Sequence, residues 1–323
     1  MSDRLTIWCN ADLGAEAEAA LREGTAGHQL VMAGEATSNL AVGGHSKELE
    51  AAQIAFGQPD ATQAMEQTGL RWVHITSAGY TRYDTDAFKA AIKGRGAAFT
   101  NSSSVFDDPC AQHLLAFMLA QARQLPQGMK AQLDGHRWDY GNLRGATRLL
   151  NGTAVLLGYG AIAKRLVELL SPFGMDLVGI RRSVRGDETI PTYPLQEVDS
   201  WLAKADHVVN ILPASPSTDG FFDADRIAKI KPGAVLTNVG RGTTVDQEAL
   251  IAALESGHLA AAYLDVTDPE PLPADHPLWS APNCFITPHI AGGFLGEATV
   301  LVEHFLENLR RFERGEDLKD RIV

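Results

Sequence analysis

Short apolar runs alternate with stretches of helical periodicity along most of the chain. This alternation is typical of parallel α/β architecture, in which each buried strand is followed by a helix that covers the sheet. The pattern falls into two series, so the sequence predicts two α/β domains with parallel sheets.

The first series predicts a small flavodoxin-like domain. Strands are expected at residues 5–9, 29–32, 70–75 and 97–100, and helices at residues 15–22 and 84–93. A final helical stretch, residues 295–315, is expected to return to this domain and pack on it. The prediction is a substrate domain made of residues 1–107 plus 294–323, with a dinucleotide-binding domain, residues 108–293, inserted into it.

The second series predicts a Rossmann-type domain. Helices are expected at residues 161–172 and 246–255, and strands at residues 153–157, 176–180, 206–211, 234–239, 259–264 and 284–287.

Two connecting segments precede this series. Turn-forming residues in NSSSVFDDP predict a domain boundary, with Pro109 in the first turn of an apolar helix that runs to residue 125. That helix is apolar around much of its circumference, which indicates burial between domains or subunits. Residues 127–151 are polar and predict a loop or arm.

The strand at 153–157 leads through GYGAIA into a helix, an arrangement that binds a dinucleotide pyrophosphate at the helix N-terminus. Gly158 permits the tight turn, Gly160 lets phosphates approach the backbone, and the small Ala163 allows close packing of helix on strand. The expected cofactor contacts here are Gly158, Tyr159, Gly160, Ala161 and Ile162. Alone, such a motif is weakly specific.

Composition narrows the possible partners. With 40 acidic and 28 basic residues the formal charge is −12, which disfavours nonspecific nucleic-acid binding. No run approaches 18 apolar residues, so we expect a cytoplasmic protein without a membrane partner. The three cysteines lie far apart and suggest neither disulfides nor a metal site.

Polar residues just past the ends of parallel strands are expected to line the ligand site. Arg241 follows the strand at 234–239, Glu270 follows the strand at 259–264, and His289 follows the strand at 284–287. Each has an ordinary structural alternative: a surface arginine, a solvated carboxylate in a proline-rich loop, or a histidine with a packing role.

Four segments taken together resemble the D-isomer specific 2-hydroxyacid dehydrogenase family. They are GYGAIA, NVGRGTTVD (238–246), YLDVTDPEPLPADHPLW (263–279) and TPHIAGG (287–293), in order and at matching spacing. The residues of these segments most resemble the glyoxylate/hydroxypyruvate reductase branch of the family.

This resemblance implies that Arg241, Glu270 and His289 form the catalytic set. Reduction of a 2-keto acid needs a proton donor, which His289 can supply. Glu270 beside the imidazole would hold its orientation and favour its charged form. Arg241 would bind the substrate carboxylate and polarise the ketone.

The resemblance also implies contacts outside the catalytic set. Backbone N–H groups of Ser77, Ala78 and Gly79 would receive the substrate carboxylate, and Arg241 and His289 complete the set of substrate-binding residues. Further cofactor contacts are expected at Leu212, Pro213, Thr218, Val239 and Asp265. A plain turn at residues 76–80 is the alternative for the first group.

The strand at 176–180 ends in Arg181, Arg182 and Ser183, where an enzyme that uses NAD usually carries an acidic residue. Two guanidiniums and a hydroxyl would bind a 2′-phosphate, so NADP(H) is predicted in preference to NAD(H). If these side chains point into solvent instead, either cofactor would serve.

The sequence thus predicts NAD(P)H-dependent reduction of a small 2-keto acid, such as glyoxylate or hydroxypyruvate, to a D-2-hydroxy acid. Another dehydrogenase of the family, such as a phosphoglycerate dehydrogenase, and a dinucleotide-sensing corepressor remain alternatives. Glu270 argues against a formate dehydrogenase, which typically pairs the histidine with glutamine. The resemblance also implies a homodimer.

Overall fold

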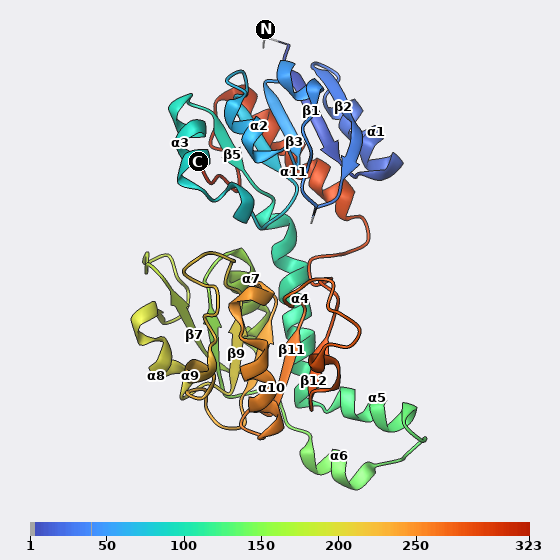
Figure 1. Ribbon diagram of the computed structural model, residues 1–323, viewed down its shortest axis with the longest axis vertical. Coiled ribbons are helices and arrows are strands. Elements are labelled where there is room, and N and C mark those ends of the chain that lie inside the picture. The colour runs from blue at the N-terminus through green and yellow to red at the C-terminus, as the bar shows by residue number, and fades with distance from the viewer. Residues whose placement is uncertain (1–3, 40) are drawn as a thin grey trace. The chain divides into compact units, whose positions relative to one another are not determined.

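The computed structural model describes residues 4–39 and 41–323. The chain divides into two compact units, residues 1–106 with 293–323 and residues 107–292 (Figure 1). The boundaries expected from the sequence lie one residue further along the chain at each junction. Both units are α/β folds with a wholly parallel sheet.

The first unit has a five-stranded sheet in the order β2-β1-β3-β4-β5. The strands are β1 Thr6–Ala11, β2 Gln29–Thr37, β3 Ile54–Gly57, β4 Trp72–Ile75 and β5 Ala98–Thr100. The helices are α1 Gly14–Gly24, α2 Ala61–Glu66, α3 Asp86–Gly94 and α11 Glu297–Arg314. As expected, the C-terminal helix returns to this unit, where Val302, Phe305 and Leu309 join the core that also holds Leu21 of α1.

Strand β3 was missing from the predicted set. Its four residues, IAFG, are all buried and carry no alternation of polar and apolar positions. So short an apolar run cannot be distinguished from a buried piece of helix by its periodicity.

The second unit has a seven-stranded sheet in the order β12-β11-β10-β9-β6-β7-β8. The strands are β6 Thr153–Leu157, β7 Asp176–Arg181, β8 Thr192–Pro194, β9 His207–Asn210, β10 Val235–Asn238, β11 Ala261–Leu264 and β12 Cys284–Ile286. The helices are α7 Ala161–Leu170, α8 Val198–Leu202, α9 Ala224–Ile227 and α10 Gln247–Glu255. Strand order reverses between β6 and β9, which is where a Rossmann sheet binds its dinucleotide. The predicted set lacked the edge strand β8, whose three residues include a proline.

Two predictions about the connecting segments were wrong. Helix α4 spans Ser103–Ala122 and therefore contains Pro109 rather than beginning there. Hydrogen-bond donors in its first turn are satisfied by a residue distant in the sequence. Asp320 accepts hydrogen bonds from both the backbone N–H and the hydroxyl of Ser104. The expected loop at 127–151 is instead largely helical, with α5 at Leu125–Leu133 and α6 at Tyr140–Ala146.

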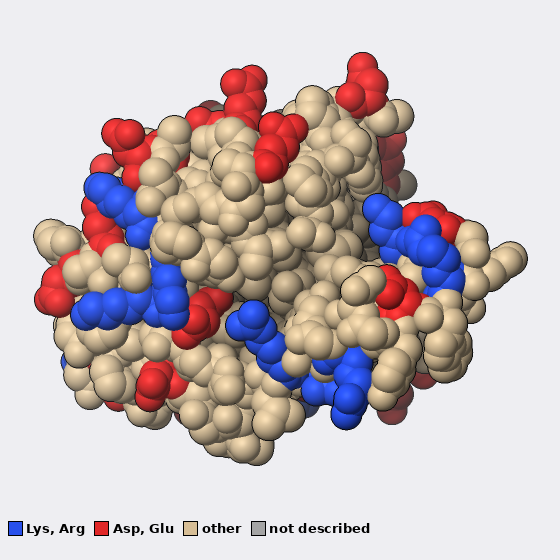
Figure 2. Space-filling model, turned by 90° about the horizontal axis from the view of Figure 1, so that it is seen from below, with Lys and Arg blue, Asp and Glu red and all other residues tan. Residues whose placement is uncertain are grey.

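Charge is mixed on the face of the described residues drawn in Figure 2, where basic side chains lie in small separate groups beside acidic ones. Within residues 4–39 and 41–323, no helix combines the length and apolar character needed to cross a membrane.

Candidate active site

The glycine turn after β6 leaves open space at the N-terminus of α7. Gly158 has a φ of +95°, and a Cβ there would lie 3.2 Å from the carbonyl oxygen of Ile211. Gly160 precedes the helix, and a Cβ built on it would meet no atom within 4 Å. Ala163 is fully buried where the helix meets the sheet. The turn therefore needs glycine for its backbone, while the space before the helix is open to a phosphate group.

This cradle fits a dinucleotide. Helix N-termini present unpaired N–H groups and a favourable dipole to anions, and Ala161 and Ile162 occupy the first turn of α7. Tyr159, the residue between the two glycines, is buried with its hydroxyl 2.9 Å from Oγ1 of Thr189.

The residues predicted to choose the cofactor lie at the end of β7 in different settings. Arg181 is mostly buried, and its Nη1 lies 2.5 Å from Oε1 of Glu188. Arg182 and Ser183 are exposed. The ion pair to Glu188 was not foreseen, because nothing in the local pattern marks this acid as a partner of Arg181.

The loop after β9 is packed against the end of β10. Leu212 N–H donates to Asn210 Oδ1 at 3.1 Å, and a Cβ on Gly240 would lie 2.5 Å from the carbonyl oxygen of Leu212. Further along, the hydroxyl of Thr218 donates to the carbonyl of Pro213 at 2.6 Å. Val239, at the end of β10, is buried.

Buried amides fix the backbone that carries Arg241. Asn238 donates to the Arg241 carbonyl at 3.0 Å and accepts from the N–H of Gly240 at 2.9 Å. Asn210 donates in turn to Asn238 at 3.1 Å and to the hydroxyl of Thr244 at 2.7 Å. These bonds hold the backbone of Arg241 in place and so fix the position from which its side chain extends.

A close approach joins this loop to the one that follows β11. A Cβ on Gly242 would lie 1.9 Å from the carbonyl oxygen of Thr267, so only glycine fits at 242. The approach brings the Arg241 loop against the segment that leads to Glu270.

Glu270 and His289 form the central pair of the site. The Oε2 of Glu270 lies 2.7 Å from Nδ1 of His289, and its Oε1 accepts the N–H of Thr267 at 3.0 Å. Partial burial raises the pKa of Glu270, but these two hydrogen bonds and the charges of His289 and Arg241 outweigh it and hold the pKa below its usual range. Glu270 is therefore charged at neutral pH, and Nε2 of His289 is left for a ligand.

Asp265 holds the loop that carries His289. The buried carboxylate accepts the hydroxyl of Thr287 at 2.6 Å and the N–H groups of Ile290 and Ala291, each at 2.9 Å. The N–H of His289 donates to the Asp265 carbonyl at 2.8 Å. His289 itself has a φ of +53°, a backbone conformation that these bonds on either side maintain.

His113, on α4, adds one further contact to this loop. Its Nε2 lies 3.1 Å from Oγ1 of Thr287. The sequence predicts no role for either residue, because the loop and the helix that meet here are distant in the chain.

In the first unit, the turn that contains Ser77, Ala78 and Gly79 follows β4. The hydroxyl of Ser77 donates to the Gly79 carbonyl at 2.8 Å, and Asn101 donates to the Ala78 carbonyl at 2.6 Å. Gln58, fully buried after β3, donates to the hydroxyl of Ser77 at 3.1 Å. Gln58 is thus a supporting residue that the sequence analysis did not identify.

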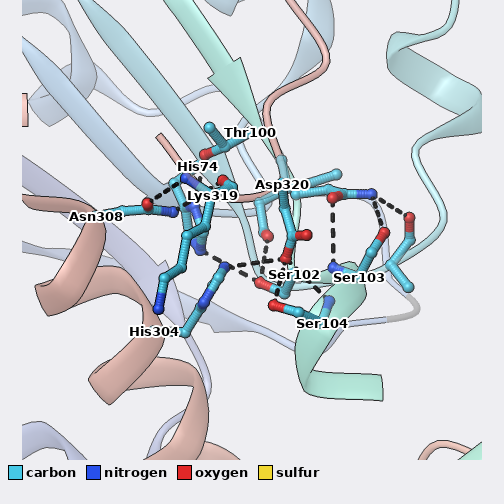
Figure 3. A network of polar contacts seen from close by, with 12 residues as sticks. His74, Thr100, Ser102, Ser103, Ser104, His304, Asn308, Lys319 and Asp320 are labelled. Atoms are coloured by element: carbon cyan, nitrogen blue, oxygen red, sulfur yellow. Dashed lines mark hydrogen bonds and ion pairs between the residues drawn. The ribbon is translucent and has the colours of Figure 1, made fainter. Parts of the chain in front are cut away.

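A second polar cluster of the first unit surrounds Asp320 and His74 (Figure 3). His304 and Asp320 point toward one another, with Nε2 3.2 Å from Oδ2. Nδ1 of the fully buried His74 lies 2.6 Å from Oγ1 of Thr100. Burial, with a contribution from nearby His304, holds the pKa of His74 well below its usual range. His74 is therefore neutral in the folded protein and forms part of its core.

Comparisons with known proteins agree with this geometry. The profile of the D-isomer specific 2-hydroxyacid dehydrogenase, NAD binding domain, matches residues 115–291, more than half of the 323-residue chain. Glyoxylate/hydroxypyruvate reductase B of Shigella boydii is 31% identical over 260 residues, 78% of each chain. D-3-phosphoglycerate dehydrogenase of Mycobacterium bovis is 33% identical over 222 residues, 68% of this chain but 41% of that protein.

A solved structure extends the likeness to the whole chain. It is a D-isomer specific 2-hydroxyacid dehydrogenase from Xanthobacter autotrophicus Py2 in complex with NADPH and MES. The two are 28% identical with a TM-score of 0.80, and the match covers 99% of this chain and 98% of that chain.

A Rossmann sheet with an imidazole–carboxylate pair at its strand ends defines a dinucleotide-dependent oxidoreductase. More specifically, the chain belongs to the D-isomer specific 2-hydroxyacid dehydrogenase family of NAD(P)-dependent enzymes.

Proposed function

We propose that this enzyme reduces a small 2-keto acid of the glyoxylate or hydroxypyruvate type to the 2-hydroxy acid, in the D configuration where the product is chiral. The observation that carries this proposal is the 2.7 Å contact between Glu270 and Nδ1 of His289. It leaves Nε2 of His289 as the proton donor that ketone reduction requires.

Each member of the set has a defined part in the reaction. A bound nicotinamide cofactor supplies the hydride that reduces the carbonyl carbon. His289 gives its Nε2 proton to the carbonyl oxygen, while the charged Glu270 stabilises the imidazolium before transfer and holds the ring. Arg241 binds the substrate carboxylate through its planar guanidinium and draws electron density from the ketone.

The proposal also covers contacts to substrate and cofactor outside the catalytic set. Backbone N–H groups of Ser77, Ala78 and Gly79 bind the substrate carboxylate. The cofactor is held by the glycine turn at 158–162, by Leu212, Pro213 and Thr218, and by Val239 and Asp265. The substrate class is supported by the likeness to a glyoxylate/hydroxypyruvate reductase over 78% of both chains.

NADP(H) is the proposed cofactor, with NAD(H) as the weaker alternative. The exposed Arg182 and Ser183 follow β7, where a guanidinium can pair with a 2′-phosphate. The relative of known structure from Xanthobacter is in complex with NADPH.

We also propose a homodimer formed through the arm, defined as helices α5 and α6 with the residues between them. Leu125, Met129 and Leu133 recur every four residues along α5, and all three are exposed. Trp138, between the helices, is 93% exposed. Apolar side chains gathered in this way usually lie under a partner.

Turnover of a keto-acid panel tests the activity. Purified enzyme with NADPH is expected to reduce glyoxylate or hydroxypyruvate with higher kcat/KM than 3-phosphohydroxypyruvate, and His289→Asn is expected to abolish turnover. A preference for the phosphorylated substrate would favour a phosphoglycerate dehydrogenase. NADPH binding without turnover of any keto acid would favour a dinucleotide-sensing protein.

A further inference from the structure

A single carboxylate organises the segment that follows β7. Glu188 Oε1 lies 2.5 Å from Nη1 of Arg181 and accepts the N–H of Arg185 at 2.9 Å. Its Oε2 accepts the N–H of Gly186 at 2.7 Å. Only 4% of the Glu188 side chain and 14% of the Arg181 side chain are exposed. The acid, at the end of residues 181–188, thus closes this segment into a loop by binding its first side chain and two backbone N–H groups near its own position.

The far end of this loop is fastened to the glycine turn. The hydroxyl of Tyr159 lies 2.9 Å from Oγ1 of Thr189 and accepts the N–H of Thr189 at 3.2 Å. The Tyr159 ring rests on β7, where a Cβ on Gly179 would lie 3.0 Å from it. The loop is therefore held by the same turn that is proposed to bind the pyrophosphate.

The charges of the segment are arranged asymmetrically. Asp187 pairs with Lys164 of α7 at 2.9 Å and with Arg181 at 3.3 Å, so both acids of the loop have cationic partners. Arg182 and Arg185 are exposed, and among the described residues neither side chain has a recorded ion pair. Negative charge that would repel a phosphate is neutralised, while two guanidiniums remain available.

We propose that Glu188 is a positioning residue for cofactor choice. It orders the loop so that Arg182, Ser183 and Arg185 bind the 2′-phosphate, while Arg181 serves as the partner of Glu188 and not as a phosphate ligand. An acid near the end of this strand ordinarily favours the unphosphorylated ribose. Here the acid is turned inward and prepares a phosphate site, which lowers the ordering cost of binding. This inference rests on the proposed preference for NADP(H).

The test measures binding of 2′,5′-ADP and 5′-AMP to the full-length enzyme by calorimetry. These probes differ by the 2′-phosphate alone. If Glu188→Gln leaves the loop ordered about a tenth of the time, affinity for 2′,5′-ADP falls about tenfold and affinity for 5′-AMP is unchanged. In turnover, KM for NADPH is expected to rise while KM for NADH stays constant. Glu168→Gln, an exposed acid on α7, is the matched control and should alter neither probe.

A second variant guards against misfolding. Tyr159→Phe removes only the hydroxyl that meets Thr189, and it is expected to weaken 2′,5′-ADP in the same direction by a smaller factor. Arg182→Gln is expected to reduce the discrimination between the probes, and to add little to the loss in the Glu188→Gln background.

Four outcomes would overturn the inference. Tighter binding of 2′,5′-ADP to Glu188→Gln would show that Arg181 is itself the phosphate ligand and that Glu188 competes for it. Equal weakening of both probes would reduce Glu188 to a structural residue. An unchanged preference in Glu188→Gln would refute the positioning role alone. A wild-type enzyme that binds the two probes equally would instead refute the NADP(H) proposal, and this inference with it.

Discussion

The hydroxyl of Thr287 donates to the buried carboxylate of Asp265 at 2.6 Å. The same carboxylate accepts the backbone N–H groups of Ile290 and Ala291, so it holds the chain on both sides of His289. Sequence resemblance implies a cofactor contact for Asp265, and the structure adds a supporting role. His289, the proposed proton donor, is thus placed by a residue whose own side chain is nearly inaccessible.

Asp265→Asn is expected to lower both stability and kcat. One carboxylate oxygen becomes an NH₂ group that cannot accept a backbone N–H, and an unsatisfied buried donor costs about 1–3 kcal/mol. The resulting displacement of His289 is expected to reduce kcat by up to about 10²-fold. Urea unfolding and steady-state kinetics measure the two effects. Asp268→Asn, an exposed change in the neighbouring loop, serves as control; unchanged kcat in Asp265→Asn would contradict the supporting role.

Glu270→Gln is expected to cut kcat/KM for keto-acid reduction by at least about 10²-fold, the usual contribution of positioned general acid catalysis. Glutamine can still contact Nδ1 of His289 but brings no charge to stabilise the imidazolium. The decline in activity toward alkaline pH should therefore begin at lower pH than in the wild type. Profiles of kcat/KM against pH measure this, with Glu255→Gln on α10 as the exposed control. A uniform loss of activity with an unshifted profile would show that the carboxylate only orients the ring.

The local features of the site are the ones that the sequence could predict. The glycine turn is contiguous in sequence, and its strand and helix lie directly beside it, so spacing alone is informative. Arg241, Glu270 and His289 stand next to strand ends, where parallel sheets gather their ligands.

Contacts between residues far apart in the sequence could not be predicted. Asp265 meets Thr287, Ile290 and Ala291 at separations of 22, 25 and 26 residues, and no periodicity encodes such a contact. The start of α4 was misplaced for the same reason, since its first turn is satisfied by Asp320, 216 residues from Ser104. A loop was predicted for the arm because most of its residues are polar. The apolar residues of α5 recur only every four positions, too sparsely to indicate a helix among the polar residues.

Buried His74 makes stability depend on pH. Its pKa is well below the usual range in the folded state, so the unfolded chain binds a proton that the folded chain does not bind. Stability is therefore lost as pH falls through the unfolded pKa. With an unfolded pKa of about 6.5, His74 alone should remove about 1 kcal/mol of unfolding free energy between about pH 7.5 and pH 5.5.

Asp320 does not contribute in that range. Its pKa is lowered, because hydrogen bonds from His304 and Ser104 outweigh the opposing effect of burial, so its stabilisation is lost only at more acid pH. Urea unfolding at the two pH values should show a smaller difference for His74→Asn than for the wild type. Equal differences in the two proteins would show that His74 titrates normally.

Gln58→Leu tests the turn at Ser77. The substitution removes the donor that Gln58 directs to the Ser77 hydroxyl, at a position that is fully buried. If this turn binds the substrate carboxylate, KM for the keto acid should rise about tenfold through lost orientation, while KM for NADPH stays constant. Gln67→Leu, at the half-buried residue that follows α2, is the control for loss of an amide. A parallel rise in both KM values would indicate general damage to the fold instead.

The arm carries the last prediction. Leu133 is 80% exposed at the end of the apolar stripe on α5, and Trp138 follows it in the chain. If these side chains lie under a second copy, Leu133→Asp buries a charge in an apolar contact, which is costly without a partner. Sedimentation velocity should find a dimer in the wild type and a monomer in this variant. Val42→Asp, at an exposed apolar position of the first unit, should leave the dimer intact. A dimer that survives Leu133→Asp and Trp138→Asp together would place the subunit contact elsewhere.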